Sequence, residues 1–160
     1  MRDMVDIPLA QRESVFEVEE GTALAPKFDE NGLIPVVTTD SKSGEVLMHG
    51  YMNKEALLLT IQNKEAYYWS RSRKSIWHKG KTSGLTQKVS SIRIDDDQDS
   101  IWLIVDVEGV GASCHVGYRS CFYRSINFES KNKVVLKFEE EEKLFDPEIV
   151  YEGQQNPTKL

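Results

Sequence analysis

A run of aspartates is the first part of the chain whose residue types and spacing could do chemistry. Asp95, Asp97 and Asp99 alternate along the sequence, and Asp96 stands between the first two. In an extended segment, side chains at i, i+2 and i+4 point to the same side, so the three alternating carboxylates would converge. Such a cluster suits a hard divalent cation such as Mg²⁺, which neutralises the repulsion. The alternative is an exposed acidic turn. An EF-hand is excluded because Ser100 occupies loop position six, which requires glycine.

The two cysteines of the chain form a second candidate metal site. Cys114 and Cys121 lie in a glycine-rich segment, and His115 adjoins the first of them. Two thiolates supply half of a tetrahedral zinc site, but the spacing lacks the short CxxC of zinc ribbons, so further ligands must come from elsewhere. The alternative is a pair of small buried hydrophobic side chains. The N-terminus lacks the pattern of a signal peptide, which predicts a cytoplasmic protein whose cysteines stay reduced.

A basic stretch with interleaved aromatic side chains is the third candidate. Its members are Arg71, Arg73, Lys74, Lys79 and Lys81 together with Trp69, Trp77 and His78. Such a stretch can bind phosphates through charge-assisted hydrogen bonds and stack a base on an aromatic face. Ser83 and Gly84 could add hydroxyl and backbone donors. The alternatives are a solvated basic loop and a Trp77 that belongs to the core. The three candidates together indicate metal-assisted hydrolysis of a phosphorylated substrate.

Composition limits the partners. The chain has 160 residues and a net charge of −6. This length suits one domain with a single core, and the acidic balance disfavours nucleic acids and anionic membranes as partners. No apolar run approaches the roughly 18 residues that a membrane-spanning helix needs.

For the elements that must position these groups, the sequence pattern predicts an α+β fold, mostly β. We expect a compact β-rich roll or barrel-like sheet with one main helix. We expect that helix at about 53–64, with Asn53 as its N-cap. The pattern predicts the following further elements: a hairpin over 34–52, strands at 66–69, 89–94 and 101–107, a loop over 70–86, and a closing hairpin over 122–138. Residues 1–23 are expected to be an extension. Residues 139–160, which begin with the acidic Glu139–Glu142, are expected to be a solvated charged tail.

Several segments, in this order and spacing, resemble the phosphoribosyl-AMP cyclohydrolases of histidine biosynthesis. They are LAPKFDENGLIPVV, EVLMHGYMNKEAL, YYWSRSRKSIWHKGKTSG, the DxDxD and GASCHVGYRSCFYR. The likeness runs from about Leu24 to Phe128, and it places the family domain at 24–138. The resemblance is to the stand-alone form, so we expect no fused pyrophosphohydrolase domain of the kind that some relatives carry behind the cyclohydrolase. The resemblance implies hydrolysis of the N1–C6 bond in the adenine ring of N1-(5-phosphoribosyl)-AMP.

The resemblance also implies an intertwined homodimer that uses zinc and Mg²⁺, with active sites at the interface. Asp95, Asp97 and Asp99 match the Mg²⁺ ligands, and Cys114 and Cys121 match two of three zinc thiolates. The third thiolate, which the partner subunit donates, is replaced here by Asp96, so the site could hold zinc or a substitute metal.

The remaining site residues carried over from the family have catalytic or substrate-binding roles. His115 matches the histidine that transfers the proton. The residues expected to bind the substrate are Trp69, Arg71, Arg73, Trp77, Lys79, Ser83, Gly84 and Arg119. The competing interpretation is a non-catalytic paralogue of the same fold that binds nucleotide or metal without turnover.

Overall fold

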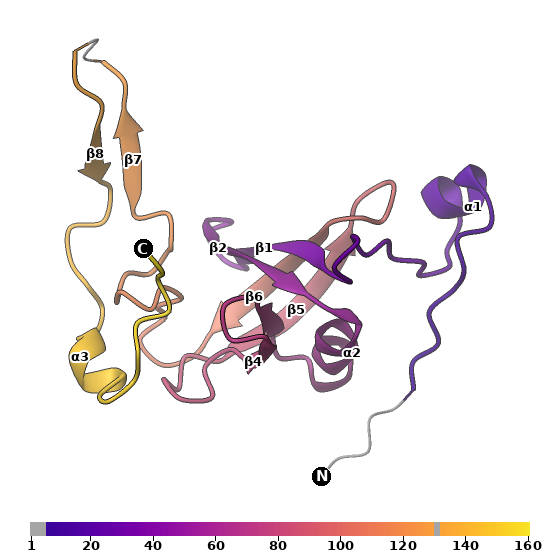
Figure 1. Cartoon of the computed structure of the whole chain (residues 1–160), viewed down its shortest axis with the longest axis horizontal. Helices are drawn as coiled ribbons and strands as arrows, with labels where there is room; N and C mark the ends of the chain where they lie inside the picture. The colour runs from indigo at the N-terminus through magenta and orange to yellow at the C-terminus, as the bar shows by residue number, and fades with distance from the viewer. Residues whose placement is uncertain (1–5, 130–131) are drawn as a thin grey trace.

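A four-stranded sheet forms the centre of the computed structural model, which describes residues 6–129 and 132–160 (Figure 1). Its order is β2-β1-β6-β5. The four strands are β1 (Ile34–Asp40), β2 (Val46–Met52), β5 (Gln87–Ile94) and β6 (Ile101–Val107). β1 and β6 run parallel, whereas β1–β2 and β5–β6 are antiparallel pairs. The α+β, mostly β class is therefore confirmed.

The β1–β2 hairpin forms where the sequence predicts it, and its turn has a clear chemical cause. The Asp40 carboxylate accepts hydrogen bonds from the backbone N–H groups of Lys42 and Ser43. The bond from Ser43 holds the pKa of Asp40 below its ordinary value. Gly44 has a φ of +73°, a conformation that glycine adopts at low cost.

Helix α2 (Lys54–Asn63) confirms the predicted main helix. The side-chain oxygen of Asn53 accepts a 2.8 Å hydrogen bond from the backbone N–H of Ala56, which caps the first turn. Lys64 ends the helix in the left-handed conformation. Ala56, Leu57 and Leu58 are buried, so this helix covers part of the core.

The basic stretch contains a second β ribbon, which corrects the expected loop over 70–86. β3 (Tyr67–Ser70) pairs antiparallel with β4 (Ser75–His78). The strands form because Ile76 and Trp77 pack against the core, so this part of the stretch has an apolar face that a solvated loop would leave exposed. Trp77 is partly buried against the core, which agrees in part with the alternative that it is a core residue.

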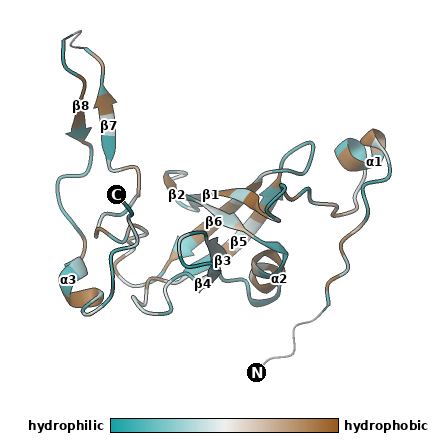
Figure 2. Ribbon diagram, viewed as in Figure 1, coloured by the Kyte–Doolittle hydropathy of each residue, from teal (hydrophilic) through white to brown (hydrophobic). Residues whose placement is uncertain are grey.

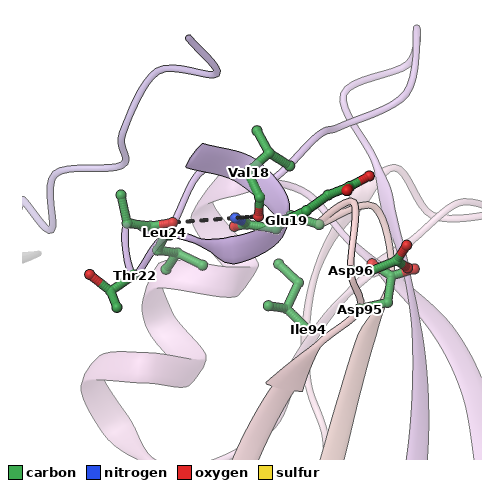
Figure 3. A pocket seen from close by; sticks show the side chains of 10 residues that line it. Val18, Glu19, Thr22, Leu24, Ile94, Asp95 and Asp96 are labelled. Atoms are coloured by element: carbon green, nitrogen blue, oxygen red, sulfur yellow. Dashed lines mark hydrogen bonds between the residues drawn. The ribbon is translucent and has the colours of Figure 1, made fainter. Parts of the chain in front are cut away.

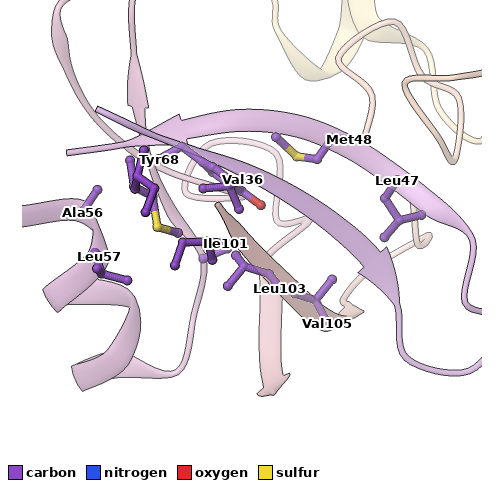
Figure 4. Packing of buried hydrophobic residues seen from close by; sticks show 12 residues of the cluster. Val36, Leu47, Met48, Ala56, Leu57, Tyr68, Ile101, Leu103 and Val105 are labelled. Carbon is purple, nitrogen blue, oxygen red and sulfur yellow. The ribbon is translucent and has the colours of Figure 1, made fainter. Parts of the chain in front are cut away.

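The core lies between the central sheet, α2 and β3 (Figure 4). Its buried members are Ile34, Val36, Leu47, Met48, Met52, Ala56, Leu57, Ala66, Tyr68, Ile101, Leu103 and Val105. From Ile101 to Val105, β6 alternates buried and half-buried residues, because successive side chains point to opposite faces of the sheet and one face lies on the core.

The predicted C-terminal hairpin forms but closes no barrel, so the barrel-like expectation is wrong for the described strands. β7 (Arg124–Asn127) and β8 (Val135–Phe138) pair with each other as a separate ribbon. Figure 1 shows this ribbon projecting from the body, and Figure 2 shows apolar residues along it. The two short helices α1 (Val15–Glu20) and α3 (Pro147–Val150) lie in the terminal segments. Within the described residues, no helix has the length and apolar character needed to cross a membrane.

Candidate active site

The acidic loop, residues 95–99, connects β5 to β6 and brings three carboxylates together. One carboxylate oxygen from each of Asp95, Asp97 and Asp99 lies within 4.8 Å of the others. The Asp95 carboxylate also accepts hydrogen bonds from the backbone N–H groups of Asp99 and Ser100, at 2.9 and 3.0 Å, which closes the turn. Sharing of a proton with Asp95 and then Asp97 raises the pKa of Asp99. Oxygen donors at this spacing fit a hard divalent cation.

Asp96 and Gln98 alternate with the three clustered aspartates but differ in exposure. Asp96 is exposed, whereas only 5% of Gln98 is exposed. Within residues 6–129 and 132–160, Asp96 joins no group of three or more metal-ligating side chains. The chain alone therefore does not bring Asp96 to the cysteines.

The cysteine loop, residues 109–121, holds both thiols in hydrogen-bond contact. Cys114 and Cys121 are free thiols, the first buried and the second exposed. The Cys121 thiol donates to the Cys114 sulfur, which lowers the pKa of Cys114 to about 6. The same pairing raises the pKa of Cys121 far above its ordinary value. The backbone N–H of Val116 donates a second hydrogen bond to the Cys114 sulfur, at 3.4 Å. One thiolate next to one thiol is a donor pair that fits a soft or borderline metal such as zinc.

Lys79, which sequence reasoning places on the phosphate, lies instead beneath the cysteine loop. Only 2% of the residue is exposed. Its Nζ donates a 2.5 Å hydrogen bond to the backbone carbonyl of Ser113 and lies 4.8 Å from the centre of the Trp77 ring. Burial lowers the pKa of Lys79, and the two nearby cysteines oppose this shift. Lys79 thus contacts the cysteine loop and holds its backbone at Ser113.

A polar network links the same loop to the core. The Tyr68 hydroxyl donates to the Gln87 side-chain carbonyl at 2.6 Å, and the Gln87 amide donates to the Ser113 hydroxyl at 3.1 Å. These are buried groups whose hydrogen bonds are costly to break. The residue next to Cys114 is therefore fixed by both its backbone and its side chain.

His115 is half-buried, and its Nε2 is buried without a hydrogen-bond partner among the described residues. Burial, and then the charge of Lys79, lower the pKa of His115, whereas a hydrogen bond with the Asn156 side chain opposes this shift. A neutral imidazole at neutral pH can accept a proton. The geometry thus leaves one ring nitrogen of His115 available for proton transfer.

Glu140 is a residue that sequence reasoning missed. Its carboxylate accepts hydrogen bonds from the backbone N–H groups of Arg119 and Ser120, at 2.8 and 3.0 Å. The backbone N–H of Leu144 donates to the Gly117 carbonyl at 2.7 Å. The segment that begins at Glu139 therefore packs on the cysteine loop, which corrects the expected solvated tail. No local signal marks Glu140, because its partners lie about twenty residues earlier in the chain.

Four cations of the basic stretch are exposed, Arg71, Arg73, Lys74 and Lys81, and the first two lie against aromatic rings. The Arg71 guanidinium stacks over Tyr51 at 4.2 Å, and that of Arg73 lies 5.7 Å from the Trp77 ring centre. Arg119, in contrast, forms a bidentate ion pair with Glu45, with distances of 2.7 and 2.9 Å. Arg71 and Arg73 are thus better placed to meet a phosphate than Arg119 is.

The remaining substrate-binding candidates lie near these cations in the sequence. Trp69 is half-buried on β3. The Ser83 hydroxyl accepts a 3.3 Å hydrogen bond from the backbone N–H of Leu85. Gly84 is exposed, has a φ of +76°, and has open space where a side chain would begin. The backbone N–H of Gly84 donates a 2.8 Å hydrogen bond to the Gly80 carbonyl, so the open space at Gly84 permits close approach of a ligand but this N–H is already paired.

Comparisons with known proteins agree on one family. The family described as phosphoribosyl-AMP cyclohydrolase matches residues 48–123. A relative of that name from Rhodopseudomonas palustris strain BisA53 is 53% identical over 135 residues, which cover 84% of this chain and 91% of the relative. A second, from strain BisB18, is 48% identical over 144 residues, covering 90% and 97%. A third, from Sinorhizobium fredii, is 51% identical over 135 residues, covering 84% and 88%.

Proposed function

The chain belongs to the phosphoribosyl-AMP cyclohydrolase family, and from this premise we propose how its residues open the adenine ring of N1-(5-phosphoribosyl)-AMP in histidine biosynthesis. The reaction adds the oxygen of water to C6, breaks the N1–C6 bond and delivers a proton to N1. The observation that carries this function is the match to relatives of that name at about half identity over most of the chain. The catalytic domain in this proposal is residues 24–138.

The proposed reaction uses two metal sites with different ligands. Asp95, Asp97 and Asp99 would hold Mg²⁺, which is supported by the convergence of their carboxylates. Cys114 and Cys121 would hold zinc or a substitute metal, which is supported by the contact between the two sulfurs. When bound, these metals supply Lewis-acid activation of water and neutralise phosphate charge.

His115 is the proposed proton carrier. Its unpartnered Nε2 can accept the proton of the attacking water and return it to N1 as the N1–C6 bond breaks. Its lowered pKa keeps the imidazole neutral before the reaction, as a general base requires. The charge of Lys79 contributes to the lowered pKa of His115, and its hydrogen bond to the Ser113 carbonyl holds the backbone of the cysteine loop.

The exposed cations of the β3–β4 ribbon are proposed to hold the phosphates. Arg71 and Arg73 can bind phosphate oxygens through charge-assisted hydrogen bonds, with Trp69 and Trp77 nearby to contact the base. The backbone at Ser83 and Gly84 is proposed to approach the substrate. Fixing both phosphates orients C6 toward the attacking water.

A homodimer would complete each active site. Asp96 is exposed on the acidic loop and joins no ligand group within the described part of one chain, so a partner subunit can donate it to the cysteines. The ribbon β7–β8 exposes Ile126, Leu136 and Phe138. Exposed apolar residues gathered on one projecting element are typical of a subunit interface.

A direct assay tests this function. Phosphoribosyl-AMP is incubated with the full-length protein in Zn²⁺ and Mg²⁺, and ring opening is followed by absorbance. We expect turnover that requires the divalent metals. The replacement of a thiolate by Asp96 favours one alternative, a paralogue that binds the nucleotide without turnover. Saturable nucleotide binding with no absorbance change would establish that alternative.

A further inference from the structure

An N-terminal strap, residues 12–27, lies against the acidic loop and is attached to it mainly through Gln98. The Gln98 side-chain carbonyl accepts a 2.8 Å hydrogen bond from the backbone N–H of Ala25. Its amide donates to the carbonyls of Val18 and Ala23, at 2.9 and 3.3 Å. The Gln98 backbone carbonyl accepts a further 2.7 Å bond from the N–H of Lys27. One buried side chain thus joins two segments that are more than seventy residues apart in sequence.

Arg12 makes a second connection from the solvent side. One of its terminal nitrogens donates to the Ala25 carbonyl at 2.7 Å, and the other donates to the Asp97 carbonyl at 2.8 Å. The guanidinium therefore bridges the strap and the backbone of a proposed Mg²⁺ ligand. It also brings a positive charge to a loop that carries four carboxylates.

The conformation of the loop depends on these contacts. Gln98 has a φ of +58°, which is uncommon for a residue with a side chain and persists only where surrounding contacts hold it. Gln98 is buried, whereas its neighbours Asp97 and Asp99 converge with Asp95, and Asp96 is exposed. Release of Gln98 would remove one of the restraints that keep the three carboxylates together, and the hydrogen bonds of the Asp95 carboxylate within the turn would remain.

The strap and the loop also enclose a pocket of about 330 Å³ (Figure 3). The residues that line it include the carboxylates of Glu19, Asp95 and Asp96, and no lysine or arginine is among them. This charge favours a cation over a free phosphate. The strap therefore contributes to an electronegative surface beside the clustered aspartates.

We propose that Gln98 and Arg12 are positioning residues through which the N-terminal strap holds the acidic loop in the geometry that binds a divalent cation. This inference rests on the proposed function, because it assigns a cation to Asp95, Asp97 and Asp99. Neither residue touches the cation; each acts through the backbone and conformation of the loop. Partners of this outer-shell kind can change metal affinity about 10- to 100-fold.

The test measures Mn²⁺ binding to the full-length protein, with the cysteine site first loaded with zinc, by the loss of the free Mn²⁺ signal in electron paramagnetic resonance. We expect Gln98→Ala to raise the Kd at least about tenfold and Arg12→Ala to raise it about threefold, with partial recovery in Arg12→Lys. Hydrogen exchange at the Ala25 amide should accelerate in Gln98→Ala, because that amide loses its acceptor. Lys42→Ala, which removes an exposed cation in the β1–β2 turn at the other end of the sheet, is the control and should leave the Kd unchanged.

The outcomes separate this inference from the proposed function. If the Ala25 amide exchanges faster but the Kd for Mn²⁺ is unchanged, the strap does not position the loop and the inference is wrong. If Asp97→Asn binds Mn²⁺ as tightly as the unmodified protein, the acidic loop is not the cation site, and the magnesium assignment fails together with the inference. Should Gln98→Ala not fold, Arg12→Ala decides alone, because Arg12 is exposed and its loss opens no core cavity.

Discussion

The Lys79 ammonium donates a 2.5 Å hydrogen bond to the backbone carbonyl of Ser113, the residue directly before Cys114. A buried ammonium is costly unless hydrogen bonds and opposite charge compensate it. Here the compensation comes from that carbonyl, the Trp77 ring and the cysteine pair. The Lys79 side chain and the cysteine pair therefore interact favourably, and this interaction is present without a bound metal.

Replacement of Lys79 should weaken metal binding at the cysteines. Lys79→Met keeps most of the buried side-chain volume but removes the charge and the hydrogen bond to Ser113. We expect zinc affinity to fall about tenfold, as for other groups that orient metal ligands. Competition with a chelator of known affinity measures this. Equal affinity in Lys79→Met and the unmodified protein would contradict the role, and Lys81→Met, which alters an exposed lysine, serves as the control.

The coupled thiols predict how many protons zinc displaces. The pKa of Cys114 is lowered to about 6, so Cys114 is a thiolate above that pH and a thiol below it. The pKa of Cys121 is raised, so Cys121 keeps its proton throughout the neutral range. Zinc binding should therefore release about two thiol protons at pH 5 but only about one at pH 8. Calorimetry in buffers of different ionisation enthalpy measures the release, and a value of two at pH 8 would refute the assignment.

His115→Ala separates proton transfer from metal binding. The variant should keep the metal at the cysteines and lose about 10²- to 10⁴-fold in turnover, the range typical of a general acid-base group. Metal content by elemental analysis and turnover by the absorbance assay are compared in the same preparation. Loss of the metal with retained rate per bound metal would make His115 a ligand instead.

Local patterns in the sequence predict most of the helices and strands, but they do not predict the contacts between these elements. Asn53 and the apolar spacing after it predict α2. The convergence of Asp95, Asp97 and Asp99 is also predicted, but for an extended segment, whereas the structure forms a turn there in which Gln98 has a φ of +58°. Gln98 and Glu140 give no such signal, because their partners are backbone groups of distant segments. Lys79 reads as a solvated phosphate ligand because lysine is seldom buried, and only the tertiary packing of β4 under the cysteine loop places it inside.

Mg²⁺ should stabilise the protein in a manner that depends on pH. Asp95 and Asp97 raise the pKa of Asp99, so repulsion in the metal-free loop is present above that pKa and is relieved as the pH falls through it. Saturating Mg²⁺ should therefore raise the melting temperature by about 5 °C at pH 7.5, and by much less near pH 4. Thermal unfolding with and without Mg²⁺, at matched ionic strength, measures the increment.

Asp97→Asn is the matched variant for that experiment. It removes one carboxylate, so the metal-free protein should be more stable than the unmodified chain at pH 7.5, and the Mg²⁺ increment should shrink. An increment that is the same in both proteins would place the cation elsewhere.

Asp96 offers the sharpest test of which metal the cysteine site holds. A carboxylate oxygen is a harder ligand than a thiolate, so two cysteines with one aspartate should admit Mn²⁺ or Fe²⁺ more readily than three cysteines would. Aspartate is also an acceptable zinc ligand, so activity with zinc is compatible with this site. Competition of metals for the apoprotein should show a weak preference for zinc, and Asp96→Cys should strengthen that preference. The exposed position of Asp96 means that this substitution disturbs no packing, so a change in ranking reports on coordination. If both proteins rank the metals identically and bind them with equal affinity, position 96 is no ligand and Asp96 faces solvent in the assembled enzyme.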